Sequence, residues 1–182
     1  MKRFIVIGIL ILLLCSGCNT IKKSWKSLFG ENLAESAQML AWDGMDAYES
    51  GNYSAAIDNF QKLKDWYPFS KYAILAELKI ADSNYHLEKY EEAIFAYEEF
   101  EKLHPRNEAI PYVIYQIGRC YFDQIDTIDR DQTPARKAYE TFQLLEKQFP
   151  DDKYARSGLE HISTCLKSLA GHEYYVGVFY YK

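Results

Sequence analysis

The chain of 182 residues carries 26 acidic and 21 basic side chains, for a net charge of −5 at pH 7. Removal of Lys2 and Arg3 with an N-terminal leader leaves 19 basic against 26 acidic residues, a net charge of −7 that gives no electrostatic support for binding nucleic acid. About 150 residues follow the N-terminal segments, which is room for one compact domain or a short repeat array.

Residues 1–17 are typical of a secretory signal peptide. Lys2 and Arg3 precede an unbroken apolar run from Phe4 to Leu14, and the small residues Ser16 and Gly17 follow it. The run is well short of the roughly 18 to 20 residues that a membrane-spanning helix needs. We therefore expect the segment to be removed.

The stretch LCSGC, residues 14–18, resembles the bacterial lipobox, although Cys15 stands where that motif usually has Leu. The resemblance implies that Cys18 becomes the lipidated first residue of the mature chain. Asn19, in place of Asp, implies the outer membrane and its periplasmic side. The alternatives are an ordinary secreted chain and a short uncleaved anchor.

Residues 18–32 form the expected lipidated N-terminus and tether. Within it, the stretch IKKSWKSLF (21–29) combines three Lys with Trp25 and Phe29. Such a stretch fits either a patch that rests on lipid headgroups or a solvated linker.

The rest of the chain repeats itself. The segment from Gly44 to Pro68 realigns on the segment from Ala81 to Pro105 with a constant shift of 37. A third copy carries the small residue Gly118 and, after an insertion, ends at Pro150. Self-similarity at such a period indicates an array of supersecondary units.

The repeated features resemble the tetratricopeptide repeat (TPR). Small residues such as Gly44 and Ala56 allow two helices to approach, Phe60 fills the groove between them, and Pro68 cannot continue the second helix. We expect an all-α superhelix of helix-turn-helix units over residues 33–182. It would contain three full repeats and a partial fourth, at about 37–70, 74–107, 111–152 and 153–182.

The expected helices occupy residues 33–50, 53–67, 71–88, 90–104, 108–123, 134–149 and 153 onward. Ser70, Asn107 and Asp152 each follow a repeat proline by two residues and are favoured N-cap types. Thr133 and Pro134 supply a cap and a first turn for the sixth of these helices.

The insertion IDTIDRDQTPARKAYETF (125–142), the stretch GNYSAAIDNFQKLKDWYPFSKYA (51–73) and the lipobox together resemble the BamD (ComL) family of outer-membrane assembly lipoproteins. The stretch HEYYVGVFYYK (172–182) is similar to the opening helix of that family's fourth repeat. The chain stops at Lys182, in mid-repeat, so we expect it to lack the family's later helices, on which docking to the barrel subunit relies.

This resemblance implies a non-enzymatic subunit of the β-barrel assembly machinery. Its expected partners are the POTRA domains of a BamA-like barrel subunit, other assembly-machinery lipoproteins, unfolded outer-membrane protein clients, and the membrane through the lipid anchor. No cofactor is expected.

Candidate chemistry is sparse. His86, His104, His161 and His172 form no catalytic or zinc pattern, and His161 with Cys165 one turn later is half a metal site at best. The acidic residues of the insertion lack the Gly and Glu positions of an EF-hand loop. We therefore expect Asp129, Arg130 and Asp131 to cap and pair with neighbouring helices.

Cys120 and Cys165 are the thiols of the repeat region. Packed helices lie 8 to 10 Å apart, whereas a disulfide needs Cα atoms within about 7 Å. We therefore favour two small buried hydrophobic residues over a bridge.

Aromatic residues mark one face of the expected first helices. Tyr48, Tyr85 and Phe122 recur at intervals of 37, and Tyr112, Tyr115 and Arg119 lie on nearby turns. Individually these rings suit packing between repeats. As a set they form a groove for an extended aromatic-bearing peptide, and the family resemblance implies the C-terminal signal of an unfolded β-barrel protein as its ligand.

Two other functions remain open. The first is a different lipoprotein adaptor with the same repeats, serving peptidoglycan coordination or pilus assembly. The second, a lipid-anchored enzyme, is disfavoured because no acid, base and nucleophile converge in the sequence.

Overall fold

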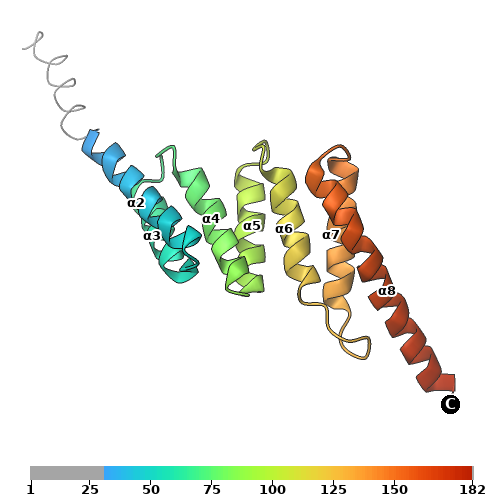
Figure 1. Cartoon of the computed structure of the whole chain (residues 1–182). Coiled ribbons are helices and arrows are strands. Elements are labelled where there is room, and N and C mark those ends of the chain that lie inside the picture. The colour runs from blue at the N-terminus through green and yellow to red at the C-terminus, as the bar shows by residue number, and fades with distance from the viewer. Residues whose placement is uncertain (1–30, 182) are drawn as a thin grey trace, which may run out of the picture.

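The computed structural model describes residues 31–181, which form a row of seven helices packed side by side in chain order (Figure 1). No strand occurs in this part of the chain. The helices are α2 (Glu31–Glu49), α3 (Tyr53–Trp66), α4 (Ala73–His86), α5 (Tyr90–Leu103), α6 (Ile110–Phe122), α7 (Thr133–Gln148) and α8 (Lys153–Tyr181). The predicted all-α fold of helix pairs is confirmed, and each predicted boundary lies within two residues of the observed one.

The predicted helix caps are only partly correct. Asp152 caps α8, because its Oδ1 accepts a hydrogen bond from the backbone N–H of Tyr154 at 2.7 Å. The Oδ1 atom of Asn107 likewise accepts a hydrogen bond from the backbone N–H of Ala109 at 2.9 Å, one turn before α6. Ser70 is not a cap, since α4 begins only at Ala73, after a turn.

The start of α7 also differs by one residue from the prediction. Thr133 is the first helical residue, so Gln132 occupies the N-cap position. The Oδ1 atom of Asp131 accepts hydrogen bonds from the N–H of Thr133 at 3.1 Å and from its hydroxyl at 2.8 Å. Asp129 and Arg130 lie exposed in the same loop.

Close approach of paired helices rests on glycine facing a buried ring. A Cβ atom on Gly44 would lie 2.7 Å from the ring of Phe60, and one on Gly118 would lie 2.5 Å from the ring of Phe142. Both rings are fully buried. The predicted pairing of a small residue with an aromatic is therefore confirmed in the first and third helix pairs.

The turn inside each of the first two repeats contains a left-handed residue. Gly51 and Glu88 stand 37 residues apart and have φ angles of 79° and 58°. Glycine adopts this conformation without cost, whereas a side chain is strained there. The first two repeats thus share a turn geometry. The first repeat has the favoured glycine at the left-handed position, and the second has Glu88.

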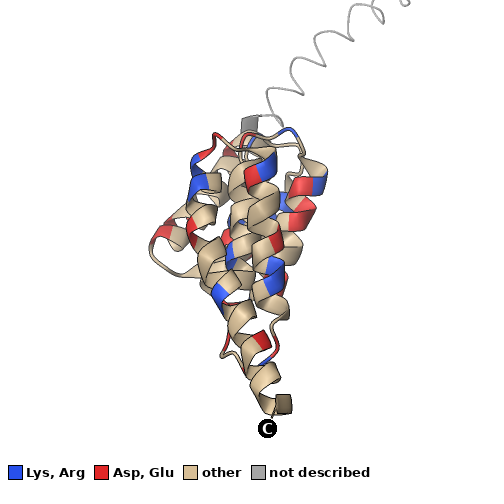
Figure 2. Ribbon diagram, turned by 90° about the vertical axis from the view of Figure 1, so that its right-hand side faces the viewer, with Lys and Arg blue, Asp and Glu red and all other residues tan. Residues whose placement is uncertain are grey.

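The last helix is held by the insertion that precedes α7. Ile128 lies against Gly171, where an added Cβ would come within 2.9 Å, and the Ile128 carbonyl lies 2.6 Å from Nδ1 of His172. The Ser168 hydroxyl donates to the buried Gln132 side chain at 2.6 Å. Beyond these contacts α8 projects from the array and carries almost no charge (Figure 2).

Cys120 and Cys165 are both free and buried, as predicted. Burial raises the pKa of the Cys120 thiol to about 12 and that of Cys165 to about 11. The signal peptide, Cys18 and most of the tether lie outside the described residues. None of the helices seen between residues 31 and 181 has the length and apolar character to cross a bilayer.

Candidate functional site

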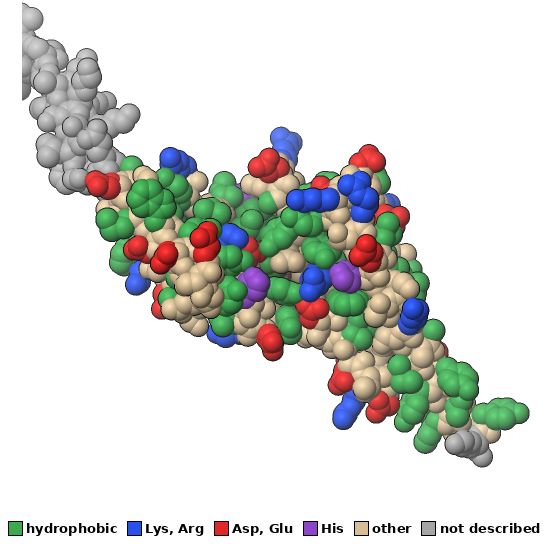
Figure 3. All heavy atoms as spheres, viewed as in Figure 1, with side chains coloured by type: hydrophobic (Ala, Val, Ile, Leu, Met, Phe, Trp, Pro, Cys, Tyr) green, Lys and Arg blue, Asp and Glu red, His purple; other side chains and the backbone are tan. Residues whose placement is uncertain are grey.

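The predicted aromatic positions lie on the first helix of each pair, where neighbouring repeats meet. The Tyr48 hydroxyl of α2 lies 3.1 Å from Nε2 of His86 on α4. The ammonium group of Lys79 sits 4.2 Å from the centre of the Tyr48 ring, in cation–π geometry. Histidine side chains are visible among hydrophobic ones across the middle of the molecule in Figure 3.

The second contact between repeats contains Tyr85 and the predicted arginine. The Tyr85 hydroxyl on α4 donates to Asp123 at 2.5 Å, directly after α6. Arg119 donates to the Tyr85 oxygen at 2.8 Å and to the Asp123 carboxylate at 3.2 Å. The guanidinium group therefore already has an acidic partner within the protein.

The third contact is built around His161 of α8. The Phe122 ring lies 4.4 Å from the imidazole, and Nε2 of His161 lies 3.3 Å from the Tyr115 hydroxyl. Burial, with the positive charge of Arg119, lowers the pKa of His161. A neutral imidazole is thus favoured between these rings.

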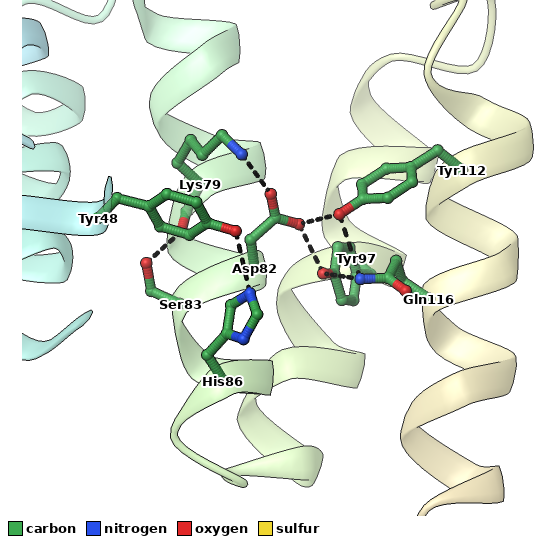
Figure 4. A network of polar contacts seen from close by, with 8 residues as sticks. All are labelled: Tyr48, Lys79, Asp82, Ser83, His86, Tyr97, Tyr112 and Gln116. Atoms are coloured by element: carbon green, nitrogen blue, oxygen red, sulfur yellow. Dashed lines mark hydrogen bonds and ion pairs between the residues drawn. The ribbon is translucent and has the colours of Figure 1, made fainter. Parts of the chain in front are cut away.

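A buried polar network joins the second and third repeats (Figure 4). Asp82 is 1% exposed and accepts hydrogen bonds at one carboxylate oxygen from Tyr97 at 2.7 Å and Tyr112 at 2.8 Å. Its other oxygen pairs with Lys79 at 2.8 Å. Gln116 donates to the two tyrosine oxygens at 3.4 and 3.1 Å. Every partner that the buried charge needs is therefore supplied by side chains.

The network also sets the ionisation of its members. Burial, followed by the Asp82 charge and its hydrogen bond, raises the pKa of Tyr112, and the same causes act on Tyr97. Burial alone would lower the pKa of Lys79, but attraction to Asp82 leaves it above its ordinary value. At neutral pH the site thus contains one ion pair and two neutral phenols.

A groove of about 540 Å³ opens beside this network on the first-helix face. Leu78, Lys79 and Asp82 line it from α4, and Tyr112 and Tyr154 line it from α6 and α8. Lys153 adds a second cation, whose ammonium group lies 4.7 Å from the centre of the Tyr154 ring. Glu108 and Asp152 also line the groove, so its two lysines stand among three carboxylates. Its rings with polar tips suit an extended peptide with aromatic side chains.

All six predicted groove residues, Tyr48, Tyr85, Tyr112, Tyr115, Arg119 and Phe122, lie half-buried on first helices. Of these, Tyr112 lines the groove itself, while the others make the contacts between repeats just described.

Sequence reasoning missed Asp82, Lys79 and Gln116 as a network. The available signal was Tyr97, which stands where the first and third repeats have Phe60 and Phe142, so its hydroxyl needed a buried partner. Within residues 31–181, no cluster of His, Cys, Asp and Glu could hold a metal ion.

Solved structures with a similar fold are TPR domains. The first TPR domain of human RPAP3 aligns with a TM-score of 0.55 at 21% identity, covering 74% of this chain and 95% of that domain. The first TPR of Spaghetti (RPAP3), bound to the HSP90 peptide SRMEEVD, aligns with a TM-score of 0.54 at 20% identity over 73% of this chain and 94% of that one. These likenesses confirm the TPR fold.

The similar curated proteins are named outer membrane protein assembly factor BamD. The protein from Caulobacter vibrioides is 27% identical over 97% of this chain and 57% of its own length. The one from Neisseria gonorrhoeae is 29% identical over 81% of this chain and 59% of its length. This chain thus spans less than two thirds of these relatives. Because the family model described as YfiO, outer membrane lipoprotein, matches residues 34–182, the chain belongs to that family.

Proposed function

We propose that this protein is a lipid-anchored scaffold of the β-barrel assembly machinery on the periplasmic face of the outer membrane. In this role it binds unfolded outer-membrane protein clients and docks on the barrel-forming, BamA-like subunit, beside other assembly lipoproteins. The observation that carries the proposal is the family match over residues 34–182, whose curated relatives are named assembly factors. A TPR array suits a scaffold because stacked helix pairs present an extended binding surface.

Clients bind along the first-helix face. Equivalent positions in successive repeats lie about 10 Å apart, so Tyr48, Tyr85 and Phe122 span a peptide of about six or seven extended residues. Aromatic client side chains stack on these rings, and exposed edges such as those of Tyr112 line the groove.

The client's terminal carboxylate pairs with Arg119. The guanidinium is suited to a carboxylate because its planar fork donates two parallel hydrogen bonds. Asp123 already occupies one donor at 3.2 Å, so the peptide either shares the arginine or displaces Asp123. Lys153, which lines the groove, is the competing cation.

Attachment to the membrane occurs through Cys18. A cysteine carrying more than one acyl chain is anchored in effect permanently. Intact-mass analysis of the protein purified from membranes should give a chain that begins at a modified Cys18, and Cys18→Ala should release the protein. A mature chain that still starts at Met1 contradicts this assignment.

Recovery of partners from membranes tests the scaffold proposal. The lipidated protein is solubilised in mild detergent and captured, and the chains that accompany it are identified. We expect a BamA-like barrel protein among them. The Cys18→Ala protein, kept from the membrane, is the control for capture after lysis. A preparation that instead contains peptidoglycan-binding or pilus proteins supports the other type of envelope adaptor and contradicts the proposal.

A further inference from the structure

An apolar pocket of about 440 Å³ lies at the N-terminal edge of the array. Leu33 and Ala37 of α2 form one wall, and Trp66, Phe69 and Tyr72 at and after the end of α3 form the other. We call it the N-terminal pocket. Three of its apolar side chains are unusually exposed: Phe69 at 101%, Trp66 at 64% and Leu33 at 53%.

The pocket also contains a buried polar atom that makes no hydrogen bond. The Oγ atom of Ser70 is buried and has no hydrogen-bond partner among the described residues. A buried hydroxyl without a partner is costly, so a donor from outside residues 31–181 would stabilise it. Exposed rings and this hydroxyl both indicate that something packs here.

The segment directly before α2 has the pattern of a matching helix. Ile21, Trp25, Leu28 and Phe29 follow the spacing i, i+4, i+7 and i+8, which places them on one helical face. Lys22, Lys23 and Lys26 occupy the other positions of the same stretch. Gly30 separates this stretch from α2, and glycine permits the sharp reversal that packing back on α2 requires.

Charge favours the same arrangement. Helix α2 contains no basic residue, and its acidic residues Glu31 and Glu35 lie within reach of a nine-residue helix, about 14 Å long, that folds back at Gly30. Lys71 is the one basic residue that lines the pocket. The segment 21–29 contains three lysines and no acidic residue. Two neighbouring helices of opposite charge attract one another at no cost in buried charge, because both polar faces stay in water.

We propose that residues 21–29 fold back as an amphipathic helix and dock in the N-terminal pocket, with Trp25 among Leu33, Trp66 and Phe69. The indole N–H is the donor available to Ser70. With Cys18 acylated as proposed above, only Asn19 and Thr20 would separate the anchor from the docked helix, a span of about 10 Å. The first repeat is then held against the bilayer, which fixes the direction in which the array projects.

Photo-crosslinking in the full-length, membrane-bound protein tests this docking. Trp25 is replaced by p-benzoylphenylalanine, the membranes are irradiated, and crosslinked peptides are mapped by mass spectrometry. We expect crosslinks within the same chain, to residues 33–38 or 66–72. Phe69→Ala should lower their yield about tenfold, since burial of the ring is lost.

A control variant and a check on folding accompany the crosslinking. Phe95→Ala removes a ring of similar exposure, 66%, from a different groove, and should leave the crosslink yield unchanged. The Phe69→Ala protein should keep the far-ultraviolet circular dichroism spectrum of the wild type, because that ring lies outside the buried core of the array. Crosslinks that go to lipid, to another chain or to other helices overturn the proposal, as does a yield that Phe69→Ala leaves unchanged.

Discussion

Among the described glycines, Gly118 makes the closest approach, to the ring of Phe142. A Cβ at position 118 would lie 2.5 Å from a ring that is 0% exposed and cannot withdraw. We expect Gly118→Ala to lower the free energy of unfolding by about 2 kcal/mol, because overpacking outweighs the gain in helix propensity. Thermal and denaturant unfolding of the two proteins measure the difference.

Gly177→Ala is the matched control for that substitution. Gly177 also lies inside a helix, but an added Cβ meets nothing within 4 Å. Its replacement should leave the free energy of unfolding unchanged or raise it by up to about 1 kcal/mol. If both alanine variants shift stability in the same direction, the steric explanation is wrong.

The Asp82 network predicts that two substitutions, Asp82→Ala and Tyr97→Phe, lower the free energy of unfolding by unequal amounts. Asp82→Ala leaves Lys79, Tyr97 and Tyr112 without their shared acceptor and should cost about 3 kcal/mol of unfolding free energy. Tyr97→Phe restores the residue type of the other repeats and should cost only about 1 kcal/mol. Equal losses in chemical denaturation would mean that the carboxylate is not the centre of the network.

His161 predicts a loss of stability in acid. Its pKa in the folded protein is lowered by burial and by Arg119, whereas the unfolded chain takes up the proton near its ordinary value of about 6.5. The contribution of His161 to the free energy of unfolding is therefore complete above that pH and is lost as the pH falls below it. Unfolding at pH 8 and pH 5 should show a smaller acid loss in His161→Gln than in the wild type. Equal losses contradict the assignment.

The helices could be predicted because the residues that end them, and the residues that pair them, follow local sequence patterns. Proline ends and small-to-aromatic spacing recur in each repeat, so boundaries came within two residues. The contact of Ile128 with Gly171 was not predictable, because it joins residues that no local pattern relates. Ser70 is not a cap because it lies in a turn before α4, in which its carbonyl accepts a hydrogen bond from the Ala73 N–H at 3.1 Å.

The end of α8 is the element least supported by its neighbours. Tyr174, Phe179, Tyr180 and Tyr181 are largely exposed, and the last contact with the insertion loop is at His172. We expect amides of residues 173–181 to exchange with solvent much faster than those of α5 in a dilute monomer. Protection equal to that of α5 in a strict monomer would contradict this. Protection that appears only with a partner would locate a docking surface.

In the molecule as a whole, stacking of the repeats brings the predicted aromatic residues onto one face. Tyr48 meets His86 and Tyr85 meets Asp123, each 38 residues further along the chain, because equivalent helices stack on one face. The recurrence of the aromatic set at intervals of 37 therefore predicts the face on which it lies. The polar partners could not, since Asp82 and His161 have no counterpart of the same type in the other repeats. The prediction therefore identified the face but not the chemistry that holds it together.

Titration of the array with a labelled peptide that ends in an aromatic outer-membrane protein signal and a free carboxylate tests client binding directly. We predict saturable binding by fluorescence anisotropy that weakens about tenfold or more with Tyr85→Ala, with Arg119→Ala, and with amidation of the peptide. If affinity depends on Lys153 and not on Arg119, the peptide binds in the groove and its carboxylate pairs with Lys153. If none of these changes affects binding, and Tyr85→Ala and Phe122→Ala lower only the melting temperature, the rings merely pack the repeats. That result would contradict client binding by these residues.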